Sequence, residues 1–228
     1  MRHTGVTTPR FVRSQLRTTD VAAARAFYAE VLGVAPGPDE VIALPERARA
    51  AGAPPHWQAQ LAVADVAAAV AQFTAAGGAA LGPTVPTADG AIAGVRDPGG
   101  ASLAVVRGAV APNALPLVWR ELFCPTLDAV WALYGAGFGW AVVDDDETTG
   151  YRRFAYAAGE PAVGGMVAAV RLPAIHPQWL HHFAVDDLDA AAAVVVQRGG
   201  LVMPAGRAGV AVCDDPQGGA FALTARRA

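Results

Sequence analysis

Two segments of the chain repeat the same helical spacing of apolar residues. In each segment, four apolar residues fall at positions i, i+3, i+4 and i+7, which places them on one face of an α-helix. The first set is Val66, Ala69, Val70 and Phe73. The second set is Leu188, Ala191, Ala192 and Val195. The pattern predicts two amphipathic helices at matching places in the chain.

Polar and glycine residues mark the ends of both predicted helices. Asp65 and Asp187 stand where a helix N-cap is expected, because a carboxylate accepts hydrogen bonds from the first free N–H groups. The pairs Gly77-Gly78 and Gly199-Gly200 stand where each helix is expected to stop. Both helices therefore have defined starts and stops.

Strand signals flank each predicted helix. The runs Gln60 to Val63 and His182 to Val185 come before the helices. The strand signals that follow end in tight turns at Asp97-Pro98-Gly99 and Asp215-Pro216-Gln217-Gly218. The order strand, helix, strands therefore occurs in both halves of the chain.

Three blocks of sequence recur in the same order, which indicates an internal duplication. Phe11 to Gly33 matches Leu117 to Gly139 at an offset of 106 residues. His56 to Gly78 matches Gln178 to Gly200 at an offset of 122. Arg96 to Gly100 matches Asp214 to Gly218 at an offset of 118.

The offsets place the domain boundaries. We expect one domain over residues 1–109, a linker at 110–116 with two prolines and no charge, and a second domain over 117–228. The second half has 16 more residues between its first two blocks, around Asp144 to Met166. This length has room for a hairpin that the first domain has shortened or lost.

Composition and charge exclude several classes of protein. Apolar residues make up 54% of the chain and charged residues 16%, which is ample material for a packed core. The net charge of −3 argues against nucleic acid, which needs a basic face. No apolar run approaches a membrane span, and Met1 to Val12 does not resemble a signal peptide. Cys124 and Cys213 fit two reduced thiols in a cytoplasmic protein.

Thr-Thr-Asp20, Phe27-Tyr28, Leu32-Gly33, Val63-x-Asp65 and Asp97-Pro-Gly-Gly together resemble the vicinal oxygen chelate superfamily, once in each half. That superfamily includes glyoxalase I, extradiol dioxygenases and bleomycin-resistance proteins. The resemblance implies an α+β fold of two glyoxalase-like domains. In each domain, paired βαβββ modules would form a curled, cup-shaped mixed sheet around a ligand cavity. The superfamily contains metalloenzymes and pure binding proteins alike, so the fold leaves the function open.

The resemblance also specifies where a catalytic metal would be held. Metalloenzymes of this group take His or Gln from the first strand, His from the strand before the second helix, and Glu from the last strand. Arg13, Gln58 and Ala104 stand at these positions in the first domain, and Trp119, Leu180 and Ala222 in the second. A divalent ion needs at least three converging donors, and only Gln58 could donate. We therefore expect no metal and no cofactor.

Strand alternation selects the side chains that would line the two cups. In the first domain we expect ligand-binding roles for Arg13, Gln15, Gln58 and Gln60. In the second domain we expect inward positions for Trp119, Glu121 and His182, with Tyr151, Arg153 and Met166 added by the extra hairpin. Trp57 and Trp179 precede core strands at a repeated position, which favours packing over ligand stacking.

The sequence leaves three hypotheses for function. The first is a metal-independent protein that binds a small, partly aromatic organic molecule, such as an antibiotic or secondary metabolite. The second is a metal-free isomerase, lyase or cyclase in which Glu121 and His182 act as an acid–base pair; the alternative is that an arginine such as Arg153 neutralises Glu121. The third is an interaction module without a ligand. A monomer and a homodimer both fit, and catalysis stays an open question.

Overall fold

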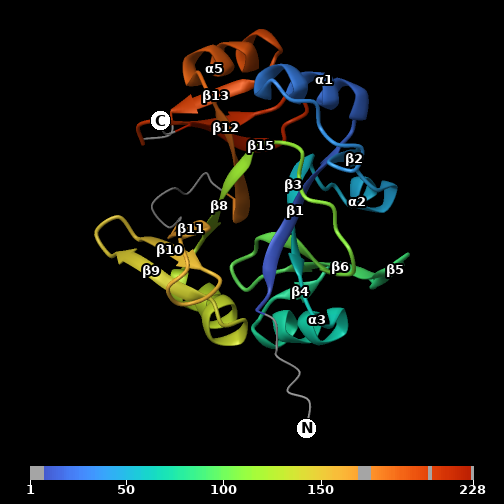
Figure 1. Cartoon of the computed structure of the whole chain (residues 1–228). Coiled ribbons are helices and arrows are strands. Elements are labelled where there is room, and N and C mark those ends of the chain that lie inside the picture. The colour runs from blue at the N-terminus through green and yellow to red at the C-terminus, as the bar shows by residue number, and fades with distance from the viewer. Residues whose placement is uncertain (1–7, 169–175, 205–206, 227–228) are drawn as a thin grey trace. The chain divides into compact units, whose positions relative to one another are not determined.

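The computed structural model describes residues 8–168, 176–204 and 207–226 and shows an α+β fold with two mixed sheets (Figure 1). Its described helices are α1 (Val21–Leu32), α2 (Glu46–Ala50), α3 (Val66–Ala75), α4 (Leu127–Trp131), the π-helical turn η1 (Ala132–Gly137) and α5 (Leu188–Gln197). None of the described helices is long and apolar enough to span a bilayer.

The first sheet comes from the first half of the sequence. Its strands are β1 (Arg10–Thr18), β2 (Val41–Ala43), β3 (His56–Ala62), β4 (Ala79–Ala80), β5 (Val85–Thr87), β6 (Gly90–Arg96) and β7 (Ser102–Arg107). They are ordered β2-β1-β3-β7-β6-β4, and β5 also pairs with β6. Parallel pairs (β1 with β2, β3 with β7) and antiparallel pairs both occur.

The second sheet comes from the second half of the sequence. Its strands are β8 (Leu117–Cys124), β9 (Ala141–Asp146), β10 (Tyr151–Ala155), β11 (Gly164–Ala168), β12 (Gln178–Val185), β13 (Leu201–Pro204), β14 (Val210–Asp214) and β15 (Ala220–Ala225). They are ordered β13-β14-β15-β12-β8-β11-β10-β9. The first and last strands of each order do not pair, so both sheets are open. The antiparallel pair β9–β10 is the hairpin predicted from the longer spacing in this half.

Aspartate caps begin three helices, and two of these caps were predicted. Asp65 accepts a hydrogen bond from the Ala68 N–H at 2.9 Å, and Asp187 accepts one from Ala190 at 2.9 Å. Asp20 caps α1 in the same way. Each of these carboxylates satisfies an N–H that has no partner inside the helix.

The chain packs into two compact units that do not follow the sequence halves. Within the described residues, unit 1 comprises 8–13, 59–111, 120–168 and 176–179, and unit 2 comprises 14–58, 112–119, 180–204 and 207–226. Each unit therefore combines one module from the first half with one module from the second. The two sheets follow the halves, whereas the two hydrophobic cores are shared between them.

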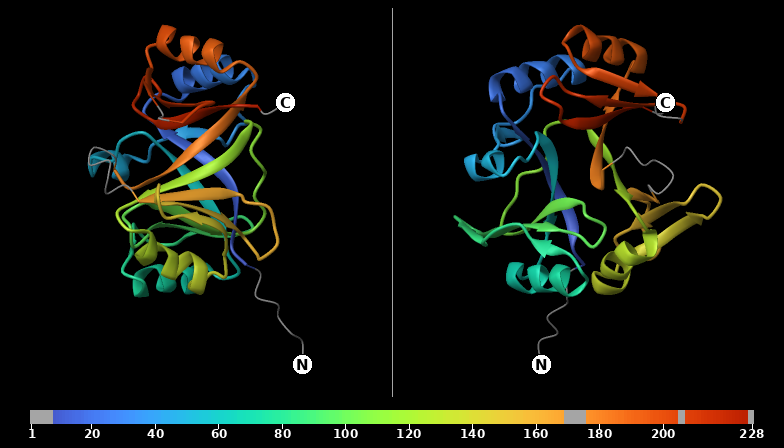
Figure 2. Two further views of the ribbon diagram at one scale, coloured as in Figure 1. Left: turned by 90° about the vertical axis from the view of Figure 1, so that its left-hand side faces the viewer. Right: turned by 180° about the vertical axis from the view of Figure 1, so that it is seen from behind.

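The core of unit 2 joins α1 of the first half to α5 and β15 of the second. The two helices lie side by side in the views of Figures 1 and 2. Tyr28 meets Trp57 and Phe221 edge-on, with ring centroids 5.2 Å apart in both pairs. Burial of each aromatic ring contributes roughly 1.5–3 kcal/mol, so residues almost a chain length apart stabilise one core.

The core of unit 1 also combines aromatic residues from both halves of the chain. Phe73 of α3 packs edge-on against Tyr134 of η1, with ring centroids 6.2 Å apart. Tyr134 stacks on Trp140, with ring centroids 4.8 Å apart. Trp179 lies edge-on to Tyr134 at 5.7 Å. Trp57 and Trp179 are both buried in these cores, which agrees with the packing role expected for them.

Candidate functional site

The candidate site in unit 2 begins with four polar side chains on β1 and β3. Leu16 and Trp57 point into the hydrophobic core, so their strand neighbours Gln15, Arg17, His56 and Gln58 belong to the opposite face. Arg17 Nε donates to Gln58 Oε1 at 3.0 Å, which joins the two strands on this face. Gln15 Nε2 donates to the Asp39 carbonyl oxygen at 2.7 Å.

Charge in this cluster is positive and partly desolvated. Burial lowers the pKa of the Arg17 guanidinium from its ordinary value, although arginine remains protonated in proteins. Burial also lowers the pKa of His56, and the nearby Arg17 charge adds to that effect. His56 Nδ1 lies 2.8 Å from the Pro54 carbonyl oxygen. Because a carbonyl only accepts, Nδ1 carries the hydrogen, and the Nε2 of the neutral ring is an acceptor.

A second polar set in unit 2 lies on β12 and β15. Phe183 and Leu223 point into the core, so His182, Ala222 and Thr224 belong to the other face. His182 Nδ1 lies 3.1 Å from Thr224 Oγ1, which fixes the orientation of the ring. The imidazole is only 1% exposed.

Unit 1 contains most of the remaining predicted ligand-binding residues. Gln60 is 1% exposed and its Oε1 has no hydrogen-bond partner within the described ranges. Glu121 is also buried, on β8, and the half-buried Arg13 is in the same unit. The Tyr151 ring lies against Gly165, where an added Cβ would fall 2.1 Å from the Tyr151 hydroxyl. The half-buried Trp119 belongs to unit 2.

Of the two other residues predicted in the extra hairpin region, Met166 points into the core, whereas Arg153, next to the core residue Phe154, belongs to the opposite strand face. Met166 is fully buried in the hydrophobic core of unit 1, where it pairs with Leu122 across β11 and β8. Arg153 is exposed, and its Nε donates to Asp144 at 2.8 Å. Since Asp144 engages the guanidinium, Arg153 does not supply the countercharge considered for Glu121.

The two members of the predicted acid–base pair belong to different compact units. Glu121 is in unit 1 and His182 is in unit 2. Each side chain is buried on its own strand. Their joint action stays a prediction.

The side chains at the family's metal positions do not form a donor set. Ala104 pairs with Gln60 across β7 and β3, and Ala222 pairs with His182 across β15 and β12. Both alanines are buried methyl groups where a carboxylate would be needed, and Leu180 is buried and apolar. Within the described ranges, no three His, Cys, Asp or Glu side chains cluster so as to hold a metal ion. The residues present do not fit the metal that the fold family implies.

Sequence reasoning placed Asp97 and Asp215 in tight turns but missed what they bind. Both turns form, and both aspartates are buried. Tyr134 donates its hydroxyl hydrogen to Asp97 Oδ2 at 3.1 Å, and Tyr28 donates to Asp215 Oδ2 at 3.0 Å. Trp57 Nε1 in turn donates to the Tyr28 hydroxyl at 2.9 Å. These repeated pairs join a helix of one half to a turn of the other, so their role is structural.

Burial changes the acidity of these groups. It raises the pKa of Asp97 from 3.8 to about 6, against the hydrogen bonds from Ala101 N–H and Tyr134 that favour the ionised form. Burial also raises the pKa of Tyr134 and Tyr28, and the neighbouring aspartates raise it further. The tyrosines therefore stay protonated donors.

The cysteines are not candidates for nucleophilic chemistry. Cys124 and Cys213 are free and buried. Burial raises the pKa of both thiols to about 12, so almost no thiolate is present at neutral pH.

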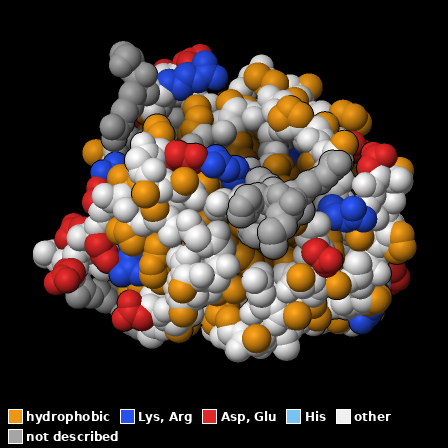
Figure 3. Space-filling model, turned by 60° about the horizontal axis from the view of Figure 1, so that its bottom comes forward, with side chains coloured by type: hydrophobic (Ala, Val, Ile, Leu, Met, Phe, Trp, Pro, Cys, Tyr) orange, Lys and Arg blue, Asp and Glu red, His pale blue; other side chains and the backbone are white. Residues whose placement is uncertain are grey.

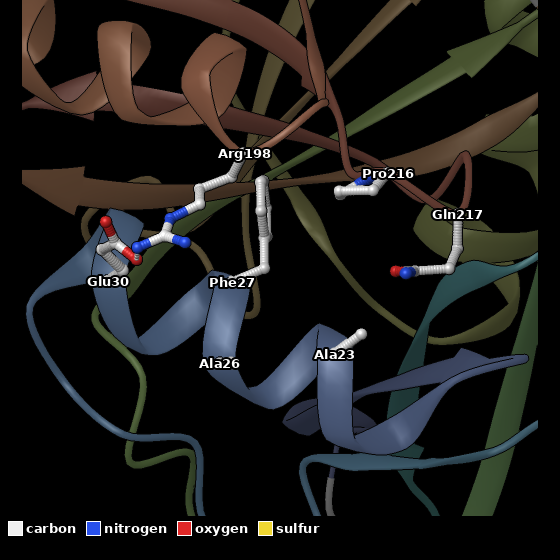
Figure 4. A pocket seen from close by; sticks show the side chains of 7 residues that line it. All are labelled: Ala23, Ala26, Phe27, Glu30, Arg198, Pro216 and Gln217. Carbon is white, nitrogen blue, oxygen red and sulfur yellow. Dashed lines mark ion pairs between the residues drawn. The ribbon is translucent and has the colours of Figure 1, made fainter.

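A groove on the helix side of unit 2 contains none of the predicted residues. It has a volume of about 210 Å³ and is lined by Ala23, Ala26, Phe27, Glu30, Arg198, Pro216 and Gln217 (Figure 4). Arg198 and Glu30 form an ion pair of 2.6 Å at one end. At the matching turn of unit 1, a Cβ added to Gly99 would meet Val130 at 2.8 Å, so a side chain like that of Gln217 does not fit there. The predicted residues Gln15, Gln58 and Gln60 lie instead on the strand faces that point away from the hydrophobic cores.

One face of the molecule carries charges of both signs. On the face shown in Figure 3, acidic and basic side chains are interspersed among apolar and polar ones.

Comparison with known families identifies the class of protein. Residues 10–105 match the family model of the glyoxalase/bleomycin resistance protein/dioxygenase superfamily, and residues 118–224 match a glyoxalase-like domain model. The chain belongs to this superfamily, with one domain match in each half. This confirms the resemblance seen in the sequence motifs.

Individual relatives and solved structures resemble the chain over most of its length. The chain is 32% identical to the protein named "Putative glyoxylase CFP32" in Mycobacterium bovis, over 95% of this chain and 94% of the relative, and equally so to the Mycobacterium tuberculosis protein of that name. The 2,3-dioxygenase LapB of Pseudomonas sp. KL28 has the same fold, with a TM-score of 0.60 at 15% identity, over 100% of this chain and 94% of LapB. A Mn(II)-bound glyoxalase of Novosphingobium aromaticivorans gives a TM-score of 0.57 at 19% identity, covering 96% and 82% of the two chains.

Proposed function

We propose that this chain is a metal-independent binding protein of the glyoxalase and bleomycin-resistance type. It holds a small, partly aromatic organic molecule on the strand faces that point away from the hydrophobic cores. Sequestering an antibiotic or a secondary metabolite is the use that this type of protein suggests.

The observation that supports the proposal is the composition of the six metal positions. Ala104 and Ala222 supply buried methyl groups, Leu180 and Trp119 supply no ligand atom, and Arg13 repels a cation. The same faces offer neutral amides and an imidazole, which suit the recognition of an organic molecule. The failure of the donor set occurs in both halves, so one domain does not compensate for the other.

The names of the relatives suggest a different activity. The mycobacterial proteins carry the name of a glyoxylase, and the fold neighbours include a dioxygenase and a Mn(II)-bound glyoxalase. Metal-dependent chemistry of those kinds needs donors that this chain lacks at the matching positions. Binding without turnover therefore fits the side chains better than either reaction.

Metal analysis of the purified full chain, combined with a thermal-shift screen, tests the proposal. The screen uses aromatic and polycyclic natural products with and without added divalent ions. We expect substoichiometric metal and stabilisation by compounds that are recovered unaltered. Stoichiometric metal, or stabilisation that requires a divalent ion, would overturn metal independence.

A second candidate function is a metal-free isomerase, lyase or cyclase. The observation in its favour is that Glu121 and His182 are both buried titratable side chains, and that Thr224 orients the imidazole. Conversion of a compound that binds in the screen, lost in Glu121→Gln while binding is retained, would support this candidate. Unchanged conversion in that variant would exclude a role for Glu121.

A further inference from the structure

Arg17 differs from six other arginines of the described chain, because it does not pair with a carboxylate. Six arginines pair with a carboxylate in the described part of the chain, namely Arg10, Arg49, Arg152, Arg153, Arg198 and Arg226. Arg17 is half-buried, and within the described ranges its one hydrogen bond goes to the neutral amide of Gln58. Its charge is therefore held next to the sheet without an acidic partner.

Partial burial of the Arg17 charge costs free energy, and a bound anion would offset part of that cost. Removing a guanidinium from water is costly unless hydrogen bonds or an opposite charge replace the lost hydration. Gln58 Oε1 satisfies only Nε, and the neighbouring Gln15 and His56 are neutral side chains already bonded to carbonyl oxygens. A negatively charged group next to Arg17 would gain charge-assisted hydrogen bonds.

The donor geometry selects the kind of anion. Because Nε is occupied, the two Nη groups of Arg17 and the Nε2 of Gln58 are left as donors on one face, with no partner within the described ranges. The Nε bond restrains the guanidinium, so its outer donors are preorganised for a planar group with two oxygen acceptors.

We propose that Arg17 and Gln58 form a subsite for the carboxylate of a small organic acid. The inference rests on the proposed binding function and deepens it, because it defines the ligand class as organic acids and identifies the residue that anchors them. Arg17 is a specificity-determining residue in this proposal.

Matched probes of the full-length protein test the subsite. Benzoate and benzamide have the same ring and nearly the same size, but only benzoate carries a charge. We expect benzoate to bind at least roughly tenfold more tightly, and to shift the NMR signals of the Arg17 Nε–H and the Gln58 side-chain amide. Equal affinities for the two probes, or benzoate shifts confined to other residues, would overturn the proposal.

Two variants and one control connect the effect to Arg17. We expect Arg17→Gln to lose roughly tenfold or more in benzoate affinity and none in benzamide affinity. Arg17→Lys keeps the charge but loses the planar fork, so it should fall between the two, and it carries the test if Arg17→Gln does not fold. Arg47→Gln on the exposed surface of α2 changes the net charge equally and should bind benzoate like the wild type.

The outcomes separate this inference from the proposed function. If neutral aromatic compounds stabilise the protein without metal and acids do so no better, the binding protein stands and the carboxylate subsite is wrong. If stoichiometric metal is found while benzoate binding still depends on Arg17, the metal-independent function is wrong and the subsite stands.

Discussion

At the residue scale, the buried carboxylate of Asp97 makes stability depend on pH. Its pKa in the folded protein, about 6, lies above the ordinary value of 3.8. Between these two values the folded state binds more protons than the unfolded state, so the Asp97 contribution to stability increases as pH falls through 6. At pH 7 the buried charge lowers the free energy of unfolding.

Asp97→Asn removes this pH dependence while retaining one amide oxygen as an acceptor. We expect the wild type to gain about 1 kcal/mol relative to the variant when the pH falls from 7 to 5. Urea denaturation of both proteins at the two pH values measures the difference. An identical difference at pH 7 and pH 5 would show that Asp97 does not titrate in this range.

The two thiols should resist modification in the folded protein. Burial raises the pKa of Cys124 and Cys213 to about 12, and both are inaccessible. We expect iodoacetamide to label neither cysteine at pH 7.5 in the native state and both in urea. Mass spectrometry of the two samples gives the count. Rapid labelling of the native protein would contradict the burial of these side chains.

Sequence reasoning at this scale was limited by distance along the chain. The turn at Asp215 follows from local residues, but its hydrogen bond to Tyr28 joins residues 187 positions apart. Arg17 is different, because alternation from Gln15 already places it on the candidate face. Arg17 lies two positions after Gln15 on the same strand, so the sequence alone is enough to place it on this face.

At the element scale, helix starts were predictable because a cap is a local interaction. Asp65 and Asp187 each bond an N–H three residues ahead, and the sequence shows both members of the pair. The π-helical turn at Ala132–Gly137 had no such local signal. Helix propensity alone does not distinguish this turn from an α-helix.

Removal of one cap should have a defined cost. Asp187→Ala deletes the acceptor for the Ala190 N–H, and we expect the free energy of unfolding to fall by about 1 kcal/mol. Asp189→Ala is the matched control, because it removes an exposed acid from the same first turn without removing a cap. It should cost a few tenths of a kcal/mol through the helix dipole. Equal losses in the two variants would show that charge, rather than capping, stabilises α5.

At the scale of the whole molecule, the repeat predicted the sheets but not the cores. The described strands between Arg10 and Arg107 form one sheet, and those between Leu117 and Ala225 form the other. Each core nevertheless combines side chains of both halves, such as Tyr28 with Phe221 and Phe73 with Tyr134. A repeat shows that modules are alike, but it does not show which module packs against which.

Separated halves should therefore fold poorly on their own. We expect fragments 1–109 and 117–228, expressed singly, to bind the dye ANS and to lack a cooperative thermal transition, because each exposes apolar residues of both cores. Mixing the two fragments should restore the transition. A cooperative melt of either fragment alone would establish the halves as independent folding domains.

The shared cores also set the timing of folding on the ribosome. Phe27 in α1 emerges 194 residues (221 − 27) before its partner Phe221. At translation rates of about 5–20 residues per second, the first helix waits roughly 10 to 40 s for that partner. During this interval its apolar face is available to chaperones and to other nascent chains, so cellular yield depends on protection of the N-terminal half during synthesis.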